Sequence, residues 1–217
     1  MTATPVHLEV GTKRVFATTV DWPGWCRSGR TEEDALEALA VHFPRYADVA
    51  AAAGVAFPAR LAKAFEVVER VPGDATTEFG APGKVADLDH EPLTKARAKR
   101  QGALVAAAWE VFDRVVAVTP EELRKGPRGG GRDRDKMVDH VFGAEAAYAR
   151  KLGVKHKPPT LDDRAAIDAL RSDLLAVLSG ASDGTPPVPN GWPVRYAAKR
   201  IAWHVLDHAW EMQDRTG

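Results

Sequence analysis

The distribution of apolar residues after position 93 is the feature of this sequence that most limits how the chain can fold. Four stretches carry apolar residues three and four positions apart, which places them on one face of an α-helix. Gly153 and Gly180 are suited to end two of these helices, because glycine adopts the left-handed conformation that follows many helices. With no strand pattern between them, the stretches predict a four-helix bundle over residues 94–118, 135–153, 161–180 and 193 to near the end of the chain.

The region between the first two of these helices carries a helix-start signal and a loop rich in Gly and Arg. Thr119 and Pro120 have the residue types found at an N-cap and at a first helical position, so we expect a further helix to begin there. Residues 124–134 then predict a loop. Its arginines could hold an anionic thiol cofactor and the loop could gate a site, although a mobile, solvated loop is the simpler interpretation.

Residues 1–80 have a mixed α/β pattern instead. Residues 81–92 have many helix and strand breakers and little periodicity, and they predict a linker between two domains. The fold class is therefore α+β, with a small N-terminal α/β module over residues 1–80 and the bundle over residues 93–217. Alternating apolar residues predict strands, of which the first is expected to be half-buried, over residues 5–10, 14–20 and 65–71.

A turn and a helix connect the second and third of these strands. Pro23 and Gly24 form a strong turn signal. A helix follows, with Thr31 as its N-cap and Asp34 at the position that completes a capping box. We expect Pro44 to end or kink this helix, because proline has no backbone N–H to donate.

Charge and cysteine content narrow the class of protein. Lys and Arg together number 30, as do Asp and Glu, so the zero net charge favours neither nucleic acid nor an anionic membrane as a partner. No apolar run approaches the roughly 20 residues that span a bilayer, and the first residues lack the pattern of a secretory signal. Cys26 is the single cysteine among 217 residues, which fits a reducing compartment. We expect a soluble, cytoplasmic protein.

Three histidines are expected to face the interior of the bundle. His204 and His208 lie one helical turn apart on the last helix, on the same side as its apolar residues. His140 follows Met137 by three positions on the second helix and faces inward as well. Neutral imidazole suits zinc, nickel, copper or iron, and three His ligands leave a coordination position for water or substrate. The alternative is three buried histidines bonded to backbone or to carboxylates.

Four neighbours on the last helix have less specific roles. Asp207 and Glu211 fall off the inner face and are either solvated or oriented toward a ring nitrogen of a ligand histidine. Trp203 and Trp210 are expected to pack in a core or at a dimer face rather than to bind substrate.

The stretches DHVFGAEAAYARKLG and WHVLDHAWEMQDR resemble the DinB/YfiT-like family of four-helix proteins, and the similarity covers residues 93–217. That family includes mycothiol- and bacillithiol-dependent transferases and isomerases. The resemblance implies a metal triad of His140, His204 and His208, zinc or nickel as the ion, and a low-molecular-weight thiol as a further cofactor. Many members have Arg directly after the last His, whereas this chain has Ala209, so the substrate is not carried over.

RVFATTVDWPGWCRSGRTEEDALEALAVHF resembles the HicB-like antitoxin module. This resemblance implies a degenerate RNase H-like fold that binds a partner protein or packs as a dimer. No paired carboxylates for two-metal nuclease chemistry are evident, and no DNA-binding segment follows. Trp22 and Trp25 are expected to be buried against the bundle rather than exposed as a contact surface, and Cys26 to be a small buried residue.

Two functions remain open at this stage. The first is a divalent-metal-dependent thiol S-transferase, or a related hydrolase or isomerase, that acts on a small-molecule electrophile, with no general base identifiable. The second is a non-catalytic regulatory protein in which the HicB-like module binds a partner and the bundle serves as a dimerising scaffold. A homodimer is compatible with either function.

Overall fold

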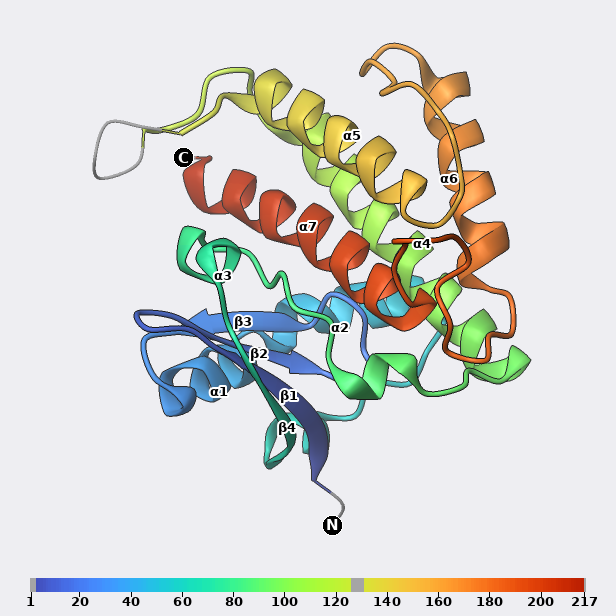
Figure 1. Ribbon diagram of the computed structural model, residues 1–217. Coiled ribbons are helices and arrows are strands. Elements are labelled where there is room, and N and C mark those ends of the chain that lie inside the picture. Colours follow the sequence, from blue (N-terminus) through green and yellow to red (C-terminus); the bar gives the residue numbers. More distant parts are fainter. Residues whose placement is uncertain (1–2, 126–130, 217) are drawn as a thin grey trace.

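Four strands form a mixed sheet in the N-terminal part of the chain (Figure 1). The computed structural model describes residues 3–125 and 131–216. The three predicted strands are confirmed, whereas the apolar pattern does not predict the third observed strand, because its sequence CRSG has no alternation. In chain order the strands are β1 (Thr4–Val10), β2 (Val15–Thr19), β3 (Cys26–Gly29) and β4 (Phe65–Pro72). Their order across the sheet is β3-β2-β1-β4. β1 pairs antiparallel with β2 and parallel with β4.

The first strand is buried on both faces, so the expectation of a half-buried strand is wrong. Val6 and Leu8 belong to the main hydrophobic cluster. His7 and Glu9 alternate with them and are buried as well, because residues 77–84 contact Glu9 and Lys199 contacts His7 on that face of the sheet. The carboxylate of Glu9 accepts a hydrogen bond from the backbone N–H of Lys84 at 2.9 Å. Such a bond satisfies a charge that would otherwise be costly to bury.

Two consecutive helices follow the strands β2 and β3. α1 (Glu32–Val41) begins with the predicted capping box, in which Thr31 and Asp34 exchange hydrogen bonds with each other's backbone N–H groups. α2 (Phe43–Ala52) starts almost at once, with Pro44 in its first turn. Proline is tolerated there because the first N–H groups of a helix have no intrahelical partner. Pro44 thus separates two helices rather than ending the helical region.

The segment after β4 contains two short helical elements. A short helix, α3 (Ala75–Phe79), precedes the predicted linker of residues 81–92, and the 3₁₀ turn η2 (Asp87–His90) lies within it. The hydroxyl of Thr77 donates to buried Glu9, which fixes the start of the segment to β1. The backbone N–H groups of Asp87 and Leu88 bind the carboxylate of Glu69 at 2.6 and 3.1 Å. The domain boundaries drawn from the sequence stay a prediction.

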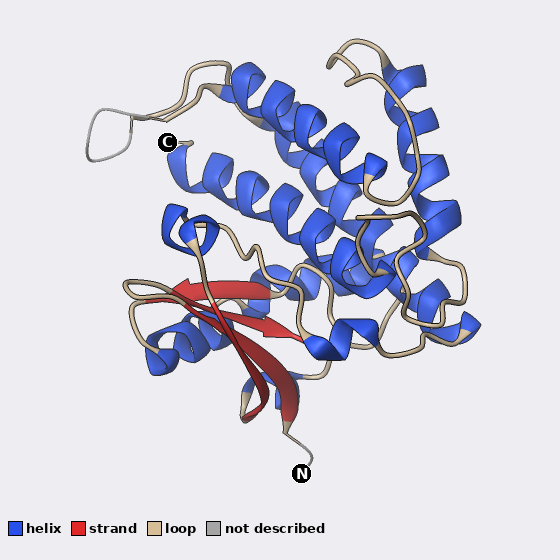
Figure 2. Cartoon of the chain, viewed as in Figure 1, coloured by secondary structure: helices blue, strands red, loops and turns tan. Residues whose placement is uncertain are grey.

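Four long helices pack side by side where the apolar spacing predicts them (Figure 2). No helix begins at Thr119 and Pro120, so that prediction is wrong. The hydroxyl of Thr119 instead donates to the carbonyl of Val115 at 2.7 Å and closes the end of the first long helix. The four helices are α4 (Lys95–Val118), α5 (Arg134–Arg150), α6 (Arg164–Leu178) and α7 (Val194–Arg215).

The turn between β2 and β3 joins the sheet to the bundle. Trp22 and Trp25 are both buried. Trp22 contacts the bundle as expected, with the guanidinium of Arg100 on α4 4.0 Å from its ring, whereas Trp25 packs against aromatic side chains of the N-terminal part. The ring of Trp25 stacks on Tyr46 with centroids 5.8 Å apart, and its indole N–H donates to the carbonyl of Leu39 at 2.9 Å. Gly24 lies so close to α7 that an added Cβ would be 2.7 Å from a methyl group of Leu206. The two parts of the chain therefore share one continuous hydrophobic core.

Within the described residues, no helix has the length and apolar character needed to cross a membrane.

Candidate metal centre

The structure brings together the three histidines that the sequence predicts as ligands. His140 comes from α5, and His204 and His208 come from successive turns of α7. The ring centroids of His204 and His208 are 4.7 Å apart, and each lies 5.1 Å from that of His140. One nitrogen from each ring can be chosen so that all three lie within 4.8 Å of one another. Such a cluster can hold one metal ion.

The separation of two ring nitrogens fits shared coordination. Nε2 of His140 lies 3.2 Å from Nε2 of His204. Two nitrogens bound to one tetrahedral zinc at about 2.0–2.1 Å would be about 3.3 Å apart. A single N–H···N hydrogen bond between the two rings would account for the same distance, and this is the structural alternative.

His208 is oriented by a carboxylate. Its Nδ1 lies 3.1 Å from Oε2 of Glu211, which can only accept, so in the neutral ring the proton sits on Nδ1. Nε2 of His208 is thereby left with its lone pair, as in histidines that bind metal. Glu211 is itself held by Arg215, whose guanidinium donates to the other carboxylate oxygen at 2.9 Å. Of the two roles expected for Glu211, solvated or orienting a ring nitrogen, this contact fits the second.

Burial keeps two of the rings neutral. Desolvation lowers the pKa of His204 well below its ordinary value, with a further contribution from His208 and Arg200. Desolvation also lowers the pKa of His140, and nearby Arg132 adds to the shift. Neutral imidazole is the form that binds a metal, so both rings are ready to coordinate near pH 7.

An aromatic and a cationic side chain border the cluster. The ring of Tyr148 meets His204 edge-on with centroids 5.6 Å apart. The guanidinium of Arg200 lies 5.5 Å from the ring of Tyr148 and 4.8 Å from that of Trp203. Neither Arg200 nor Arg215 is predicted from the sequence. The spacing of Arg215 four positions after Glu211 is a signal that could have identified their pair.

The remaining face of α7 packs against the sheet. Trp203 and Trp210 are buried, and Trp203 meets the ring of Phe16 edge-on at 6.1 Å. Asp207 accepts a hydrogen bond from Arg27 at 2.7 Å instead of contacting a histidine. The tryptophans thus have the packing role expected for them.

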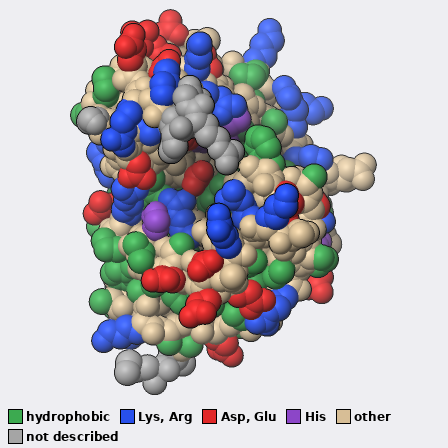
Figure 3. All heavy atoms as spheres, turned by 90° about the vertical axis from the view of Figure 1, so that its left-hand side faces the viewer, with side chains coloured by type: hydrophobic (Ala, Val, Ile, Leu, Met, Phe, Trp, Pro, Cys, Tyr) green, Lys and Arg blue, Asp and Glu red, His purple; other side chains and the backbone are tan. Residues whose placement is uncertain are grey.

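A cavity of about 470 Å³ lies between α7 and the sheet; none of the three histidines lines it, and Glu211, which contacts His208, connects its wall to the cluster. Glu211 belongs to its wall, together with apolar surface from Trp203 and Trp210 and cations from Arg27 and Arg215. Figure 3 shows that this side of the molecule is hollowed, with acidic and basic side chains around the hollow. The cavity is large enough for a small organic molecule.

The ends of the Gly/Arg loop lie against the C-terminal end of α7. Arg215 donates to the backbone carbonyls of Arg124 and Arg132 at 2.9 and 2.8 Å, and Arg124 donates to that of Asp214 at 2.7 Å. The centre of the loop, residues 126–130, lies outside the described residues, and the gating role stays a prediction.

No match was found among protein-family models, curated proteins or solved structures. The resemblances to DinB/YfiT-like and HicB-like proteins therefore stay predictions. The features of this chain that bear on function are the geometry of the histidine cluster and its surroundings.

Proposed function

We propose that His140, His204 and His208 hold a divalent metal ion and that the protein is a metal-dependent thiol S-transferase, or a related hydrolase or isomerase. The observation that carries the proposal is the convergence of three imidazoles from two helices, two of them with Nε2 atoms 3.2 Å apart. Imidazole ligands suit zinc and nickel. Such an ion supplies Lewis acidity, which lowers the pKa of a coordinated thiol or water.

The composition of the cluster favours a reactive centre over a structural one. Structural zinc sites are closed by four protein ligands, whereas three ligands leave room for a reactant. In the described residues the cluster consists of three histidines with no cysteine or carboxylate among them. Glu211 keeps His208 in the ligand tautomer, and the buried ring of His204 is kept from water. We place the substrate in the cavity beside Glu211.

Bound metal is the first quantity to measure. Untagged protein, purified without chelator and equilibrated with zinc or nickel, is expected to hold about one ion per chain by elemental analysis. His208→Ala is expected to lose the ion. His156→Ala is a matched control, because His156 pairs with Asp173 outside the cluster. Trace metal in the wild type, or equal metal in wild type and His208→Ala, would reject the metal centre.

Turnover tests the second half of the proposal. The metal-loaded protein is expected to transfer a low-molecular-weight thiol to an electrophile or to hydrolyse an activated substrate, and the metal-free protein is not. Stoichiometric metal without turnover of either kind would retain the metal centre and reject the enzyme.

The regulatory alternative is less well supported. A partner-binding HicB-like module would be expected to present Trp22 and Trp25 as a contact surface. Both side chains are buried within this chain, with Trp22 packed against Arg100 and Phe57. The two side chains therefore make their contacts within this chain rather than with a partner protein.

A further inference from the structure

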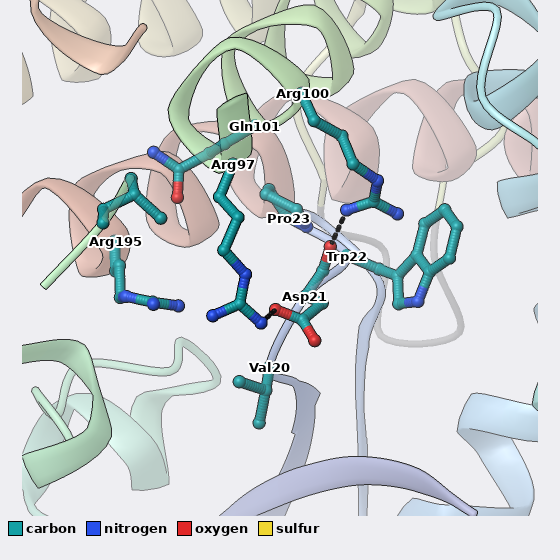
Figure 4. A pocket seen from close by; sticks show the side chains of 9 residues that line it. Val20, Asp21, Trp22, Pro23, Arg97, Arg100, Gln101 and Arg195 are labelled. Carbon is teal, nitrogen blue, oxygen red and sulfur yellow. Dashed lines mark hydrogen bonds and ion pairs between the residues drawn. The ribbon is translucent and has the colours of Figure 1, made fainter. Parts of the chain in front are cut away.

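A second cavity, of about 260 Å³, lies at the start of α4 and α7, beside the turn that follows β2 (Figure 4). It shares no lining residue with the histidine cluster or with the cavity beside Glu211. Its wall is formed by Val20, Asp21, Trp22, Pro23, Leu93, Arg97, Arg100, Gln101 and Arg195.

The charges around this cavity are unbalanced. Three guanidinium groups, those of Arg97, Arg100 and Arg195, line it together with the single carboxylate of Asp21. Counting one positive charge for each arginine and one negative charge for Asp21, the lining carries a net charge of +2. Positive charges gathered around one cavity attract anions.

Arg195 is the most constrained of the three arginines. It is 6% exposed, and it donates through Nε to the carbonyl of Glu91 at 3.2 Å and through Nη2 to that of Pro92 at 3.1 Å. These two bonds do not involve Nη1. Within the part of the chain that the structure describes, Arg195 has no carboxylate at ion-pair distance. A buried guanidinium without a countercharge is costly, and an anion in the cavity would supply that charge.

The other two arginines are only partly compensated. Arg100 donates to the backbone carbonyl of Asp21 at 2.6 Å and lies over the ring of Trp22 at 4.0 Å, but neither contact neutralises it. Arg97 reaches the carboxylate of Asp21 at 3.4 Å, with both side chains well exposed to solvent. Exposed pairs of this kind contribute little. Figure 4 shows the guanidinium groups of Arg97 and Arg195 directed toward one another across the hollow.

We propose that this cavity binds a small, doubly charged oxyanion, either a phosphate group or a dicarboxylate. The net charge of +2 matches a dianion, and guanidinium groups bind carboxylate and phosphate oxygens through paired N–H donors. The volume admits a ligand of a few heavy atoms and is below the usual range for drug-sized molecules. The site is independent of the proposed metal centre.

Titration calorimetry with inorganic phosphate, malonate and acetate tests the proposal at low ionic strength. Phosphate or malonate is expected to bind with one site per chain, and the monoanion acetate at least tenfold more weakly. The tighter of the two dianions identifies the class of ligand. Added NaCl is expected to weaken binding, because the attraction is electrostatic.

Variants separate the arginine cavity from other anion sites. Arg97→Ala is expected to weaken binding roughly tenfold, the effect of losing one hydrogen bond to a charged group. Because Arg97 is exposed, this variant should fold normally. Arg114→Ala, an exposed arginine on the same helix, and His208→Ala, in the metal cluster, are expected to bind as the wild type does. Absence of binding up to about 10 mM phosphate and malonate, which corresponds to almost no affinity, would overturn the proposal. Unchanged affinity in Arg97→Ala would do so as well.

Discussion

Lys199 of α7 and Asp89 of η2 form a buried ion pair, with Nζ 2.5 Å from Oδ1. The ammonium group also lies 3.5 Å from Nδ1 of His7 on β1, to which it can donate. Lys199 thus connects the sheet, the segment after β4 and the last helix inside the protein. The two parts of the chain are held together by buried polar contacts as well as by the shared apolar core.

Removing the cation of this pair is expected to be strongly destabilising. Lys199→Met keeps a side chain of similar length but leaves the carboxylate of Asp89 buried without its countercharge. We expect a loss of about 3–5 kcal/mol in the free energy of unfolding, measured by urea denaturation. Adding Asp89→Asn to Lys199→Met should recover part of that loss. Glu32→Gln, which breaks the exposed pair with Arg70, is the control and should change little.

The stability of the protein is expected to fall below pH 6.5, because His7 is buried in neutral form. Burial, and then the charge of Lys199, lower the pKa of His7 well below its ordinary value of 6.5. A small cavity lies beside His7. The charged side chains that line it are the three cations Lys84, Lys199 and Arg200, and the thiol of Cys26 and the hydroxyl of Tyr196 line it as well. The carboxylate of Asp89 is paired with Lys199, whose ammonium group also contacts His7.

The sign of the effect follows from proton binding. Below pH 6.5 the unfolded chain protonates His7 and the folded chain does not, so folding loses up to about 1.4 kcal/mol per pH unit from this group. The contribution is fully present above pH 6.5 and declines as the pH falls toward the lower pKa of the folded state. Urea denaturation between pH 5 and 8, at intervals over that range, should show a shallower slope for His7→Gln. An unchanged slope would mean that His7 is not buried in neutral form.

The thiol of Cys26 is expected to be unreactive in the folded protein. Burial raises its pKa to about 12, although Thr18 donates a hydrogen bond to the sulfur at 3.0 Å. Only the thiolate is an effective nucleophile. A disulfide reagent that releases a coloured thiolate should therefore react slowly at pH 8 and rapidly after unfolding in urea. Rapid reaction of the native protein would show that this pocket opens.

The long helices and the clustered histidines could be predicted because their signal is local. The apolar spacing in residues 94–118 and 194–215 depends on helix geometry alone. His204 and His208 are one helical turn apart, which places both on the same face of α7. His140 could be added because it lies inward on its own helix. The face that a residue takes on a helix is decided within a few positions, so no knowledge of the tertiary structure is needed.

The contacts that join the two parts could not be predicted. Asp207 pairs with Arg27, 180 positions away, and Lys199 meets His7 across 192 positions. Nothing in the local pattern marks these residues as partners. Strand β3 could not be predicted for a related reason, because CRSG is held in place by pairing with β2. The start of α2 could not be predicted because Pro44 is compatible with a helix start as well as with a helix end.

The carboxylate that orients His208 is expected to change the metal affinity of the proposed centre. Glu211→Gln keeps the shape of the side chain but replaces the charged acceptor of the Nδ1 proton. Changes to such orienting groups typically lower metal affinity by about 10–100-fold. Competition with a coloured chelator would measure this. Asp207→Asn is the matched control, because Asp207 lies next to His208 in sequence but pairs with Arg27. Equal losses in the two variants would argue against a specific role for Glu211.

Gly24 is expected to be irreplaceable for reasons of packing as well as backbone conformation. Its φ of +91° disfavours any L side chain, and a Cβ there would be 2.7 Å from Leu206 and 3.1 Å from Ala202 on α7. Gly54 has a φ of +65° with open space around it. Gly54→Ala should therefore cost about 1–2 kcal/mol from backbone strain alone.

Gly24→Ala should cost a further 1–3 kcal/mol or so, because the turn must move away from α7. Urea denaturation of both variants gives the comparison directly. The loss in Gly24→Ala is expected to exceed that in Gly54→Ala and to be accompanied by a change in the fluorescence of buried Trp22 and Trp25, which flank the turn. Equal losses, with unchanged fluorescence, would show that the turn does not pack tightly on α7 and that the two parts of the chain are joined elsewhere.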